Sequence, residues 1–182
     1  MVNMYKLGLT NLQQEILRLL FIKSGTSLNA RGIARFLDVT QPAVSKALPL
    51  LEKQHLIKIL KDRESKRLAI ELNRNDYRVI WLKRADNIKQ LYESGLVQNL
   101  YDSFSSATII LFGSYAFGED TTRSDIDIAI VGAKEKEVKL TVFDKMLERK
   151  VFLHHYKNFK NIDKNLLNNI CNGIVLKGAV EL

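Results

Sequence analysis

The chain has 182 residues, of which 46% are hydrophobic and 26% are charged, and its formal net charge is +8 at pH 7. This composition is typical of a soluble globular protein with one large or two small domains. No apolar run approaches the ~20 residues that cross a membrane, the N-terminus lacks the features of a signal peptide, and the single cysteine, Cys171, excludes an internal disulfide and a cysteine-built metal site. We therefore expect a cytoplasmic protein with no membrane partner, in which Cys171 lies in a core.

The positive charge is concentrated in the first part of the chain. Residues 1–73 contain twelve Lys and Arg against six Asp and Glu, whereas residues 74–106 and 107–182 each have a net charge of +1. Such an excess is the electrostatic footprint of a nucleic-acid-binding module, although a solvated basic surface would give the same count.

Apolar residues at helical spacing predict three helices in the first third of the chain. Their expected ranges are 11–22, about 28–37 and about 41–54. We expect Thr10 or Asn11 to cap the first helix and Thr40 to cap the third, because a side-chain oxygen there accepts a hydrogen bond from a free backbone N–H group. Pro49 removes a backbone hydrogen bond inside the third helix, so a bend or an early end is expected there.

Two segments of alternating polarity, 56–60 and 66–72, lie on either side of a charged loop and predict a β-hairpin with a basic tip. Three helices followed by such a wing resemble the winged helix-turn-helix domain of MarR- and ArsR-like transcription regulators. The resemblance is carried by RGIARFLDVTQPAVSKALPLLEKQHLIKI and by the wing ending KRLAIEL. That family often has glycine after the third helix; this chain has His55, a residue that tolerates a left-handed backbone better than most.

The resemblance implies that residues 1–73 bind double-stranded DNA, with the third helix in the major groove and the wing on the backbone. It implies base contacts from Thr40, Gln41, Ser45 and Lys46. It implies phosphate contacts from Arg31, Lys61, Arg63, Lys66 and Arg67. The same fold also serves as a protein-binding module, and the local positive charge favours DNA.

Residues 74–106 form a helical linker in this interpretation. From Asp76 to about Phe104 apolar residues recur at helical spacing, and Gly95 divides the segment into two helices. The linker either makes the protein a homodimer that reads two half-sites, as winged regulators do, or packs onto its own domains.

The third part, residues 107–182, alternates short strands and helices and predicts a small mixed sheet with flanking helices, so that the whole chain belongs to the α+β class. The expected strands are 108–112, 125–131, 150–156 and 174–176. The expected helices are a short one after Gly113, a long one at about 134–149 and a last one at 163–172.

Within this part, a Gly-Ser turn and a pair of aspartates predict a Mg²⁺–nucleotide site. Gly113-Ser114 opens a short helix after an apolar strand, where free backbone N–H groups suit a phosphate. Asp125 and Asp127 lie two apart at the start of a strand, so their carboxylates share a face and repel each other unless a cation neutralises them. The alternative to such a site is a simple turn followed by a strand that begins with polar residues.

Gly113-Ser114, a ten-residue spacer and Asp125-Ile126-Asp127 resemble the signature of the DNA polymerase beta-like nucleotidyltransferases, in particular the minimal type. The resemblance implies that Asp125 and Asp127 hold Mg²⁺ (or Mn²⁺). It implies that Ser114 and the backbone at Gly113 grip the phosphates of an NTP, with ATP the expected nucleotide. Arg123, in the spacer, could reach a phosphate or stay solvated.

The third carboxylate that this family usually has on the next strand is replaced here by Phe152. His154 lies two residues further on the same face and could be a substitute ligand or base, or a purely structural histidine. Glu148 could approach the site only if the preceding helix ends close by.

The combined resemblance implies a metal-dependent nucleotidyltransferase that moves a nucleoside monophosphate from an NTP to a hydroxyl, fused to a DNA-binding domain. The alternative is a transcription regulator whose nucleotidyltransferase domain only binds nucleotide or is inactive. Minimal nucleotidyltransferases often act as antitoxins that modify a HEPN-domain toxin, so a separate toxin of that type is also an implied partner.

Overall fold

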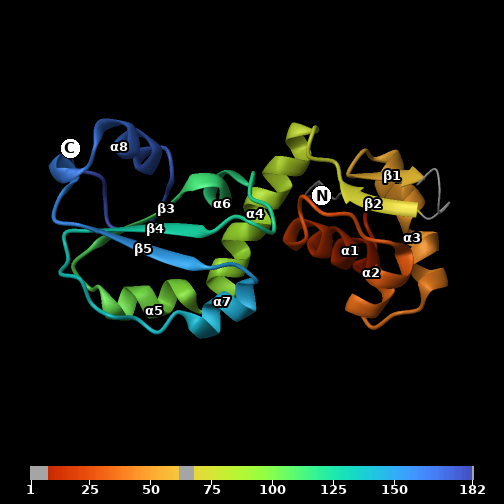
Figure 1. The fold of residues 1–182 in the computed structure, drawn as a ribbon, viewed down its shortest axis with the longest axis horizontal. Coiled ribbons are helices and arrows are strands. Elements are labelled where there is room, and N and C mark those ends of the chain that lie inside the picture. Colours follow the sequence, from red (N-terminus) through yellow and green to blue (C-terminus); the bar gives the residue numbers. More distant parts are fainter. Residues whose placement is uncertain (1–7, 62–67, 182) are drawn as a thin grey trace, which may run out of the picture. The chain divides into compact units, whose positions relative to one another are not determined.

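The structure is a computed structural model that describes residues 8–61 and 68–181, and it separates into two compact units, Met1–Val79 and Ile80–Leu182 (Figure 1). Together they confirm the α+β class. In the described ranges, no helix is long and apolar enough to cross a membrane.

The first unit contains three helices and a two-stranded antiparallel hairpin. These are α1 (Asn11–Ile22), α2 (Ala30–Phe36), α3 (Gln41–Lys53), β1 (Ile57–Lys61) and β2 (Leu68–Leu72). Their packed side chains form one core, with Ile16, Ile33, Val44, Leu51 and Ile70 fully buried. Helix, helix-turn-helix and wing therefore follow one another as the sequence predicts, and the fold is a winged helix-turn-helix.

The ends of these helices follow from capping chemistry. Thr10 caps α1 in a capping box with Gln13: the Gln13 N–H donates to the Thr10 hydroxyl at 3.3 Å, and the Thr10 N–H donates to the Gln13 side chain at 2.9 Å. The prediction for α2 began two residues too early, because Leu28 pairs with Ile70 of the wing and Asn29 caps the helix, and it ended one residue too late. His55 has the left-handed backbone that its position predicts, with φ +59°.

Pro49 does not end α3 early. The helix continues through it to Lys53, so that part of the prediction was wrong. Pro49 is exposed while Leu48 and Leu51 on either side of it are buried. Tertiary packing of the apolar stripe therefore holds the helix together past the missing hydrogen bond.

The second unit is built on a four-stranded sheet in the order β5-β4-β3-β6. Its strands are β3 (Thr108–Phe112), β4 (Ile126–Val131), β5 (Val151–Tyr156) and β6 (Ile174–Lys177). β3 is antiparallel to both of its neighbours, whereas β4 and β5 run parallel. This is the small mixed sheet that the sequence predicts.

Helices cover both faces of this sheet (Figure 1). One core contains Ile109, Leu111, Ile128 and Ile130 of the strands and is covered by α4 (Tyr77–Glu93), α5 (Leu96–Ser103), α6 (Gly113–Phe117) and α7 (Thr141–Leu147). A second core contains Ile110, Phe112, Ala129 and Val131 and is covered by the 3-10 turn η1 (Phe159–Asn161) and by α8 (Lys164–Cys171). The alternation of strand residues between two faces is what separates the two cores.

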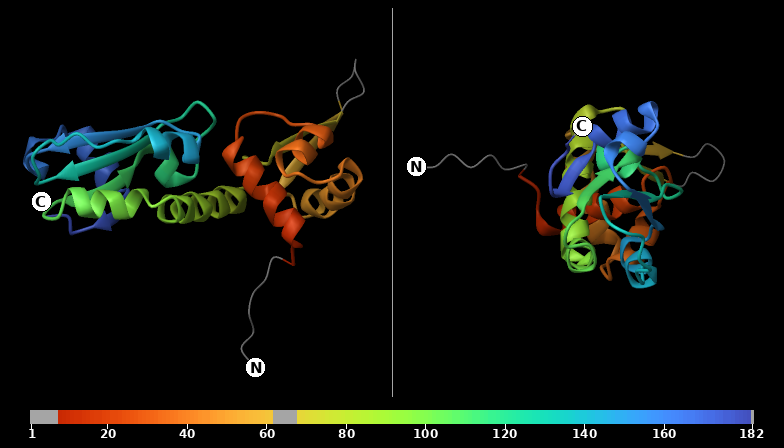
Figure 2. Two further views of the ribbon diagram at one scale, coloured as in Figure 1. Left: turned by 90° about the horizontal axis from the view of Figure 1, so that it is seen from below. Right: turned by 90° about the vertical axis from the view of Figure 1, so that its left-hand side faces the viewer.

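The two helices of the expected linker pack against the second unit (Figure 2). Leu91, Leu96, Val97 and Leu100 are buried in the same core as the strand residues. Gly95 divides the helices as predicted, with φ +78°. These contacts confirm that the segment packs onto its own domain, and the homodimer stays a prediction.

Two predictions in this unit were wrong. The long helix expected at 134–149 is only α7, because Ala133, Val138 and Leu140 reach the core from a segment that is not helical. Cys171 is exposed, since it ends α8 next to Ile170, which takes the inward position.

Candidate functional site

The turn, the aspartates and the start of β5 meet at one end of the sheet. Phe112, the last residue of β3, is paired with Asp127, and Ile126 is paired in parallel with Val151. Gly113 follows β3, whereas Asp125 precedes β4 and Lys150 precedes β5. All three residues therefore lie at the same end of the sheet. This arrangement places the Gly-Ser turn on one side of the aspartate pair and the start of β5 on the other.

Gly113 lies directly against Asp127. It has φ +73°, and a Cβ atom there would lie 3.0 Å from the Oδ2 atom of Asp127. A side chain at this position would be strained by the backbone and would crowd the carboxylate. The glycine therefore leaves Oδ2 of Asp127 facing the turn, which is where a metal–phosphate group would need it.

The other oxygen of Asp127 is bonded to His154. Nε2 of His154 lies 2.9 Å from Oδ1 of Asp127, and the side chains are 38% and 32% exposed. Because an ionised carboxylate only accepts, Nε2 carries the hydrogen. The His154 ring also packs edge-on against Phe112 at a centroid distance of 5.3 Å. His154 is therefore brought to the site, as an orienting partner of Asp127.

Phe152 lies beside Asp127 in the β4–β5 register and is 48% exposed. The position expected for a third acid is thus next to the aspartate pair and carries an apolar ring. Within the described ranges, no three acidic, histidine or cysteine side chains come together as a metal site. Mg²⁺ is often held by one or two carboxylates with phosphate oxygens and water completing the shell, so the exposed Asp125 and the half-exposed Asp127 fit one such ion together with a triphosphate.

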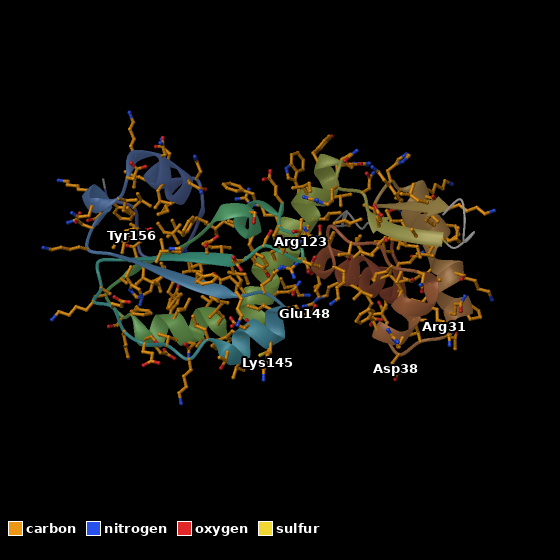
Figure 3. All side chains as sticks on the ribbon, viewed as in Figure 1. Arg31, Asp38, Arg123, Lys145, Glu148 and Tyr156 are labelled. Carbon is orange, nitrogen blue, oxygen red and sulfur yellow. The ribbon has the colours of Figure 1, made fainter. Side chains whose placement is uncertain are left out.

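A pocket of about 360 Å³ opens beside Asp125. It is lined from the spacer, from α7 and from the residues just before β5: Thr122, Arg123, Ser124, Asp125, Asp144, Lys145, Glu148, Arg149 and Lys150. Figure 3 shows Arg123, Lys145 and Glu148 at this end of the sheet and Tyr156 at the opposite end of β5. α7 ends at Leu147, and Glu148, with φ +51°, therefore reaches the pocket that Asp125 lines.

The residues expected to contact DNA form a polar surface on the first unit. Arg31, Gln41, Ser45 and Lys46 are exposed, and Thr40 is exposed while its hydroxyl caps α3. A surface hollow of about 510 Å³ is lined by Arg31, Gln41 and Ser45 together with Leu68 of the wing. Lys61 is exposed at the end of β1, whereas Arg63, Lys66 and Arg67 lie outside the described residues.

Residues 96–180 match the family model described as "Polymerase beta, Nucleotidyltransferase". This part of the chain is a polymerase beta-type nucleotidyltransferase domain. The match contains the Gly-Ser turn, the aspartate pair and every strand of the sheet, but it begins after α4. No curated protein matches the chain.

Solved structures similar to the chain include transcription regulators. Adhesin competence repressor (AdcR) from Streptococcus pyogenes is 26% identical over 57% of this chain and 72% of that one, with a TM-score of 0.43. A cysteine-to-serine mutant of ZitR from Lactococcus lactis is 23% identical over 57% and 68%, with a TM-score of 0.43. The MepR–DNA complex from S. aureus is 28% identical over 54% and 80%, with a TM-score of 0.38. At such TM-scores the likeness carries no conclusion about function.

A buried ionic cluster supports the spacer of the nucleotidyltransferase signature, and the sequence did not reveal it. Lys83 and Asn87 of α4 both hydrogen-bond Asp120 of the spacer, the latter at 2.7 Å, and Arg149 lies 3.3 Å from the other Asp120 oxygen. All four side chains are at least 95% buried. Burial lowers the pKa of Lys83, and the charge of Asp120 partly offsets this.

Asn87 also donates to the carbonyl oxygen of Tyr115 in α6, at 2.9 Å. The cluster therefore connects α4 to both sides of the spacer, and Arg149 connects it to the residues before β5. A signal was present in the sequence: Val79, Lys83, Asn87 and Leu91 are spaced four apart on α4, and all four are buried.

Proposed function

We propose that the protein is a metal-dependent nucleotidyltransferase that also binds DNA, and that it transfers a nucleoside monophosphate from an NTP to a hydroxyl group. The observation that carries this proposal is the contact between Gly113 and Asp127. It joins the two halves of the signature at one sheet edge, with Oδ2 of Asp127 directed at the turn.

Each residue of the site has a role in this proposal. The backbone at Gly113 and the hydroxyl of Ser114 bind the β- and γ-phosphates, and Asp125 and Asp127 hold Mg²⁺ or Mn²⁺. The metal supplies neutralising charge for the phosphates and for the departing pyrophosphate. His154 fixes the orientation of Asp127 through its hydrogen bond to Oδ1. The lysine, asparagine and arginine around Asp120 keep the spacer in place.

The experiment is a pair of measurements on the full chain: ATP affinity by calorimetry with Mg²⁺, and pyrophosphate release with candidate hydroxyl acceptors. Asp127→Asn and Ser114→Ala should each weaken ATP binding at least tenfold, since each removes a charge-assisted contact. Glu135→Gln is the control, because Glu135 is an exposed acid on the segment before α7. ATP binding that is insensitive to both substitutions would refute the proposal.

A second function is favoured by one specific observation. Phe152 occupies the place beside Asp127 where a third acid is expected, and His154 already engages one Asp127 oxygen. The nucleotidyltransferase domain could then bind Mg²⁺–NTP as a ligand without turnover, and the protein would be a nucleotide-responsive regulator. ATP binding without pyrophosphate release for any acceptor, NTP or metal would favour this function over the first.

DNA binding by the first unit is part of both proposals. It is supported by the net charge of +6 in residues 1–73 and by the exposed Gln41, Ser45 and Lys46 along α3 beside Arg31. A homodimer would place two such helices on two half-sites. Gln41→Ala should relax sequence preference, whereas Arg31→Gln should weaken binding to all sequences and lower its salt dependence. Fluorescence anisotropy on the protein's own promoter tests this, with Lys134→Gln as control.

The proposed reaction needs a hydroxyl acceptor. Resemblance to minimal nucleotidyltransferases makes a separate HEPN-domain toxin one protein that could carry it. The pocket beside Asp125 bears directly on this choice.

A further inference from the structure

We propose that the pocket beside Asp125 binds the acceptor, and that this acceptor carries a phosphate group near its reacting hydroxyl. The inference rests on the proposed nucleotidyl transfer and adds the acceptor class to it. Three observations lead to it: the position of the pocket, the cations that line it and the acid at its wall.

The position of the pocket follows from the order of the strands. Gly113 and Ser114 follow β3, on one side of β4, and the pocket lies on the other side, between the start of β4, α7 and the residues before β5. In phosphoryl-type transfer the attacking and leaving oxygens are roughly in line through phosphorus. If the Gly-Ser turn holds the phosphates that leave, the attacking hydroxyl enters from the side of the pocket.

The pocket offers two cations to an anionic ligand, beside the acids Asp125 and Glu148. Lys150 is paired with Asp144 at 2.8 Å, and Arg149 is held by Asp120 at 3.3 Å. Arg123 and Lys145 are exposed, and in the described part of the chain neither side chain has an ion-pair partner. Two such cations, a guanidinium from the spacer and an ammonium from α7, suit a phosphate, which takes several charge-assisted hydrogen bonds.

The pocket also has hydroxyl groups and a size that fit this class. Thr122 and Ser124 line it beside Arg123. A volume of about 360 Å³ is at the small end of ligand pockets, which suits a phosphorylated alcohol or sugar, or the terminal nucleotide of a strand. Both sources present the same chemistry, a hydroxyl a few bonds from a phosphate.

Glu148 is the proton acceptor in this proposal. It lines the same pocket as Asp125, at the position where α7 has just ended. In the reaction, the acceptor oxygen forms a bond to the α-phosphorus of the NTP. The bond from that phosphorus to the oxygen of the departing pyrophosphate breaks, and the hydroxyl proton passes to the Glu148 carboxylate.

The first test is a binding experiment without nucleotide or metal. Glycerol 3-phosphate and glycerol are titrated into the full chain and followed by NMR or calorimetry. We expect glycerol 3-phosphate to bind and glycerol not to bind. In the Arg123→Gln/Lys145→Gln double variant, the glycerol 3-phosphate affinity should fall at least tenfold, with ATP affinity unchanged. Lys134→Gln and Lys136→Gln, exposed lysines outside the pocket, should change neither.

The second test is transfer from ATP with Mg²⁺, in arms that separate the two sources. One arm offers glycerol 3-phosphate and the other a short single-stranded oligonucleotide with a 3′-hydroxyl, with its 3′-deoxy form as the blank. Either arm giving a labelled product supports the proposal and names the source. Glu148→Gln should leave the ATP affinity unchanged and lower the transfer rate about a hundredfold, because the proton acceptor is removed. Glu137→Gln, an exposed acid on the same segment as Glu135, is its control.

Two results would overturn the inference. One is a double variant that loses ATP affinity while glycerol 3-phosphate binding is unchanged, because Arg123 would then serve the nucleotide. The other is equal labelling of glycerol 3-phosphate, glycerol and a tyrosine-containing peptide, which would remove any role for the phosphate. Failure of the proposed function is distinct from both: ATP would not bind to the wild-type chain, whatever happens in the pocket.

Discussion

Lys83 donates a hydrogen bond to Asp120, and both side chains are 1% exposed. The pair joins α4 to the spacer between the Gly-Ser turn and the aspartates. Arg149 shares the same carboxylate, so that one buried acid serves two buried cations. Removing one member of such an ion cluster strongly lowers the free energy of unfolding, because the remaining charges stay buried without compensation.

Asp120→Asn should therefore lower the free energy of unfolding by about 3 to 5 kcal/mol, because it takes the counter-charge of Asp120 away from Lys83 and Arg149. Urea denaturation of the full chain measures this. Glu135→Gln, which changes the charge equally on an exposed residue, should change the free energy by less than about 0.5 kcal/mol. Equal effects of the two substitutions would show that the cluster does not stabilise the fold.

The lowered pKa of Lys83 predicts a pH dependence of stability. Burial, the first cause of the shift, disfavours the charged ammonium, so the folded-state pKa lies below the ordinary 10.5. Between these two pKa values the unfolded chain binds more protons than the folded chain, and the free energy of unfolding rises as pH increases through that window. Lys83→Met lacks this contribution. We therefore expect the free energy of unfolding of wild type to rise relative to that of this variant as pH approaches 10.5. A difference that stays constant across the window would contradict the prediction.

Gly118 ends α6 with φ +76°, and a Cβ atom there would lie 2.5 Å from the carbonyl oxygen of Ile80. Gly118→Ala should destabilise the protein by about 3 kcal/mol, because strain in the backbone adds to a clash with α4. Gly132→Ala is the matched control, with φ +85° and open space around the added Cβ. It should cost about 1 kcal/mol. Thermal unfolding of both variants separates backbone strain from the close approach of the spacer to α4.

Phe152→Asp should create a third carboxylate beside Asp127. The register of β4 and β5 pairs the two residues directly, and Phe152 is exposed enough for a charged side chain. We expect Mn²⁺ to bind at least tenfold more tightly than in wild type, as followed by electron paramagnetic resonance, because a third ligand oxygen joins the pair. Val175→Asp, on the exposed edge strand β6, is the control and should not change Mn²⁺ affinity.

The sequence predicted the elements whose signal is local. The first helix at 11–22 and the strand at 108–112 are confirmed to the residue, because a cap or a continuous apolar run marks their ends. The segment before α7 could not be predicted in the same way. Val138 and Val142 are apolar at a spacing that suits a helix, but Val138 reaches the core from an irregular segment, which only tertiary packing decides.

In the candidate site too, the residues with a local sequence signal were predicted, and those that only tertiary packing brings together were missed. Gly113, Asp125 and Asp127 are close in sequence and carry a recognisable spacing. Counting along one strand placed His154 on the face of Phe152, as a substitute ligand, a base or a structural histidine, and its hydrogen bond to Asp127 was not predicted. The Asp120 cluster was missed because Lys83 and Arg149 lie far from the motif in sequence, and a lysine inside a helical pattern ordinarily faces solvent.

The continuous helix α4 has a consequence for dissecting the gene. The family match begins at residue 96, and a fragment started there would seem a natural piece to express. Such a fragment would lack Lys83 and Asn87, which are two of the three side chains that bond Asp120, and it would lack Leu91 and so uncover part of the core. A nucleotidyltransferase fragment that keeps these contacts therefore includes Lys83, Asn87 and Leu91 of α4. A recombination event that exchanged winged modules in front of this domain would have to preserve the helix whole.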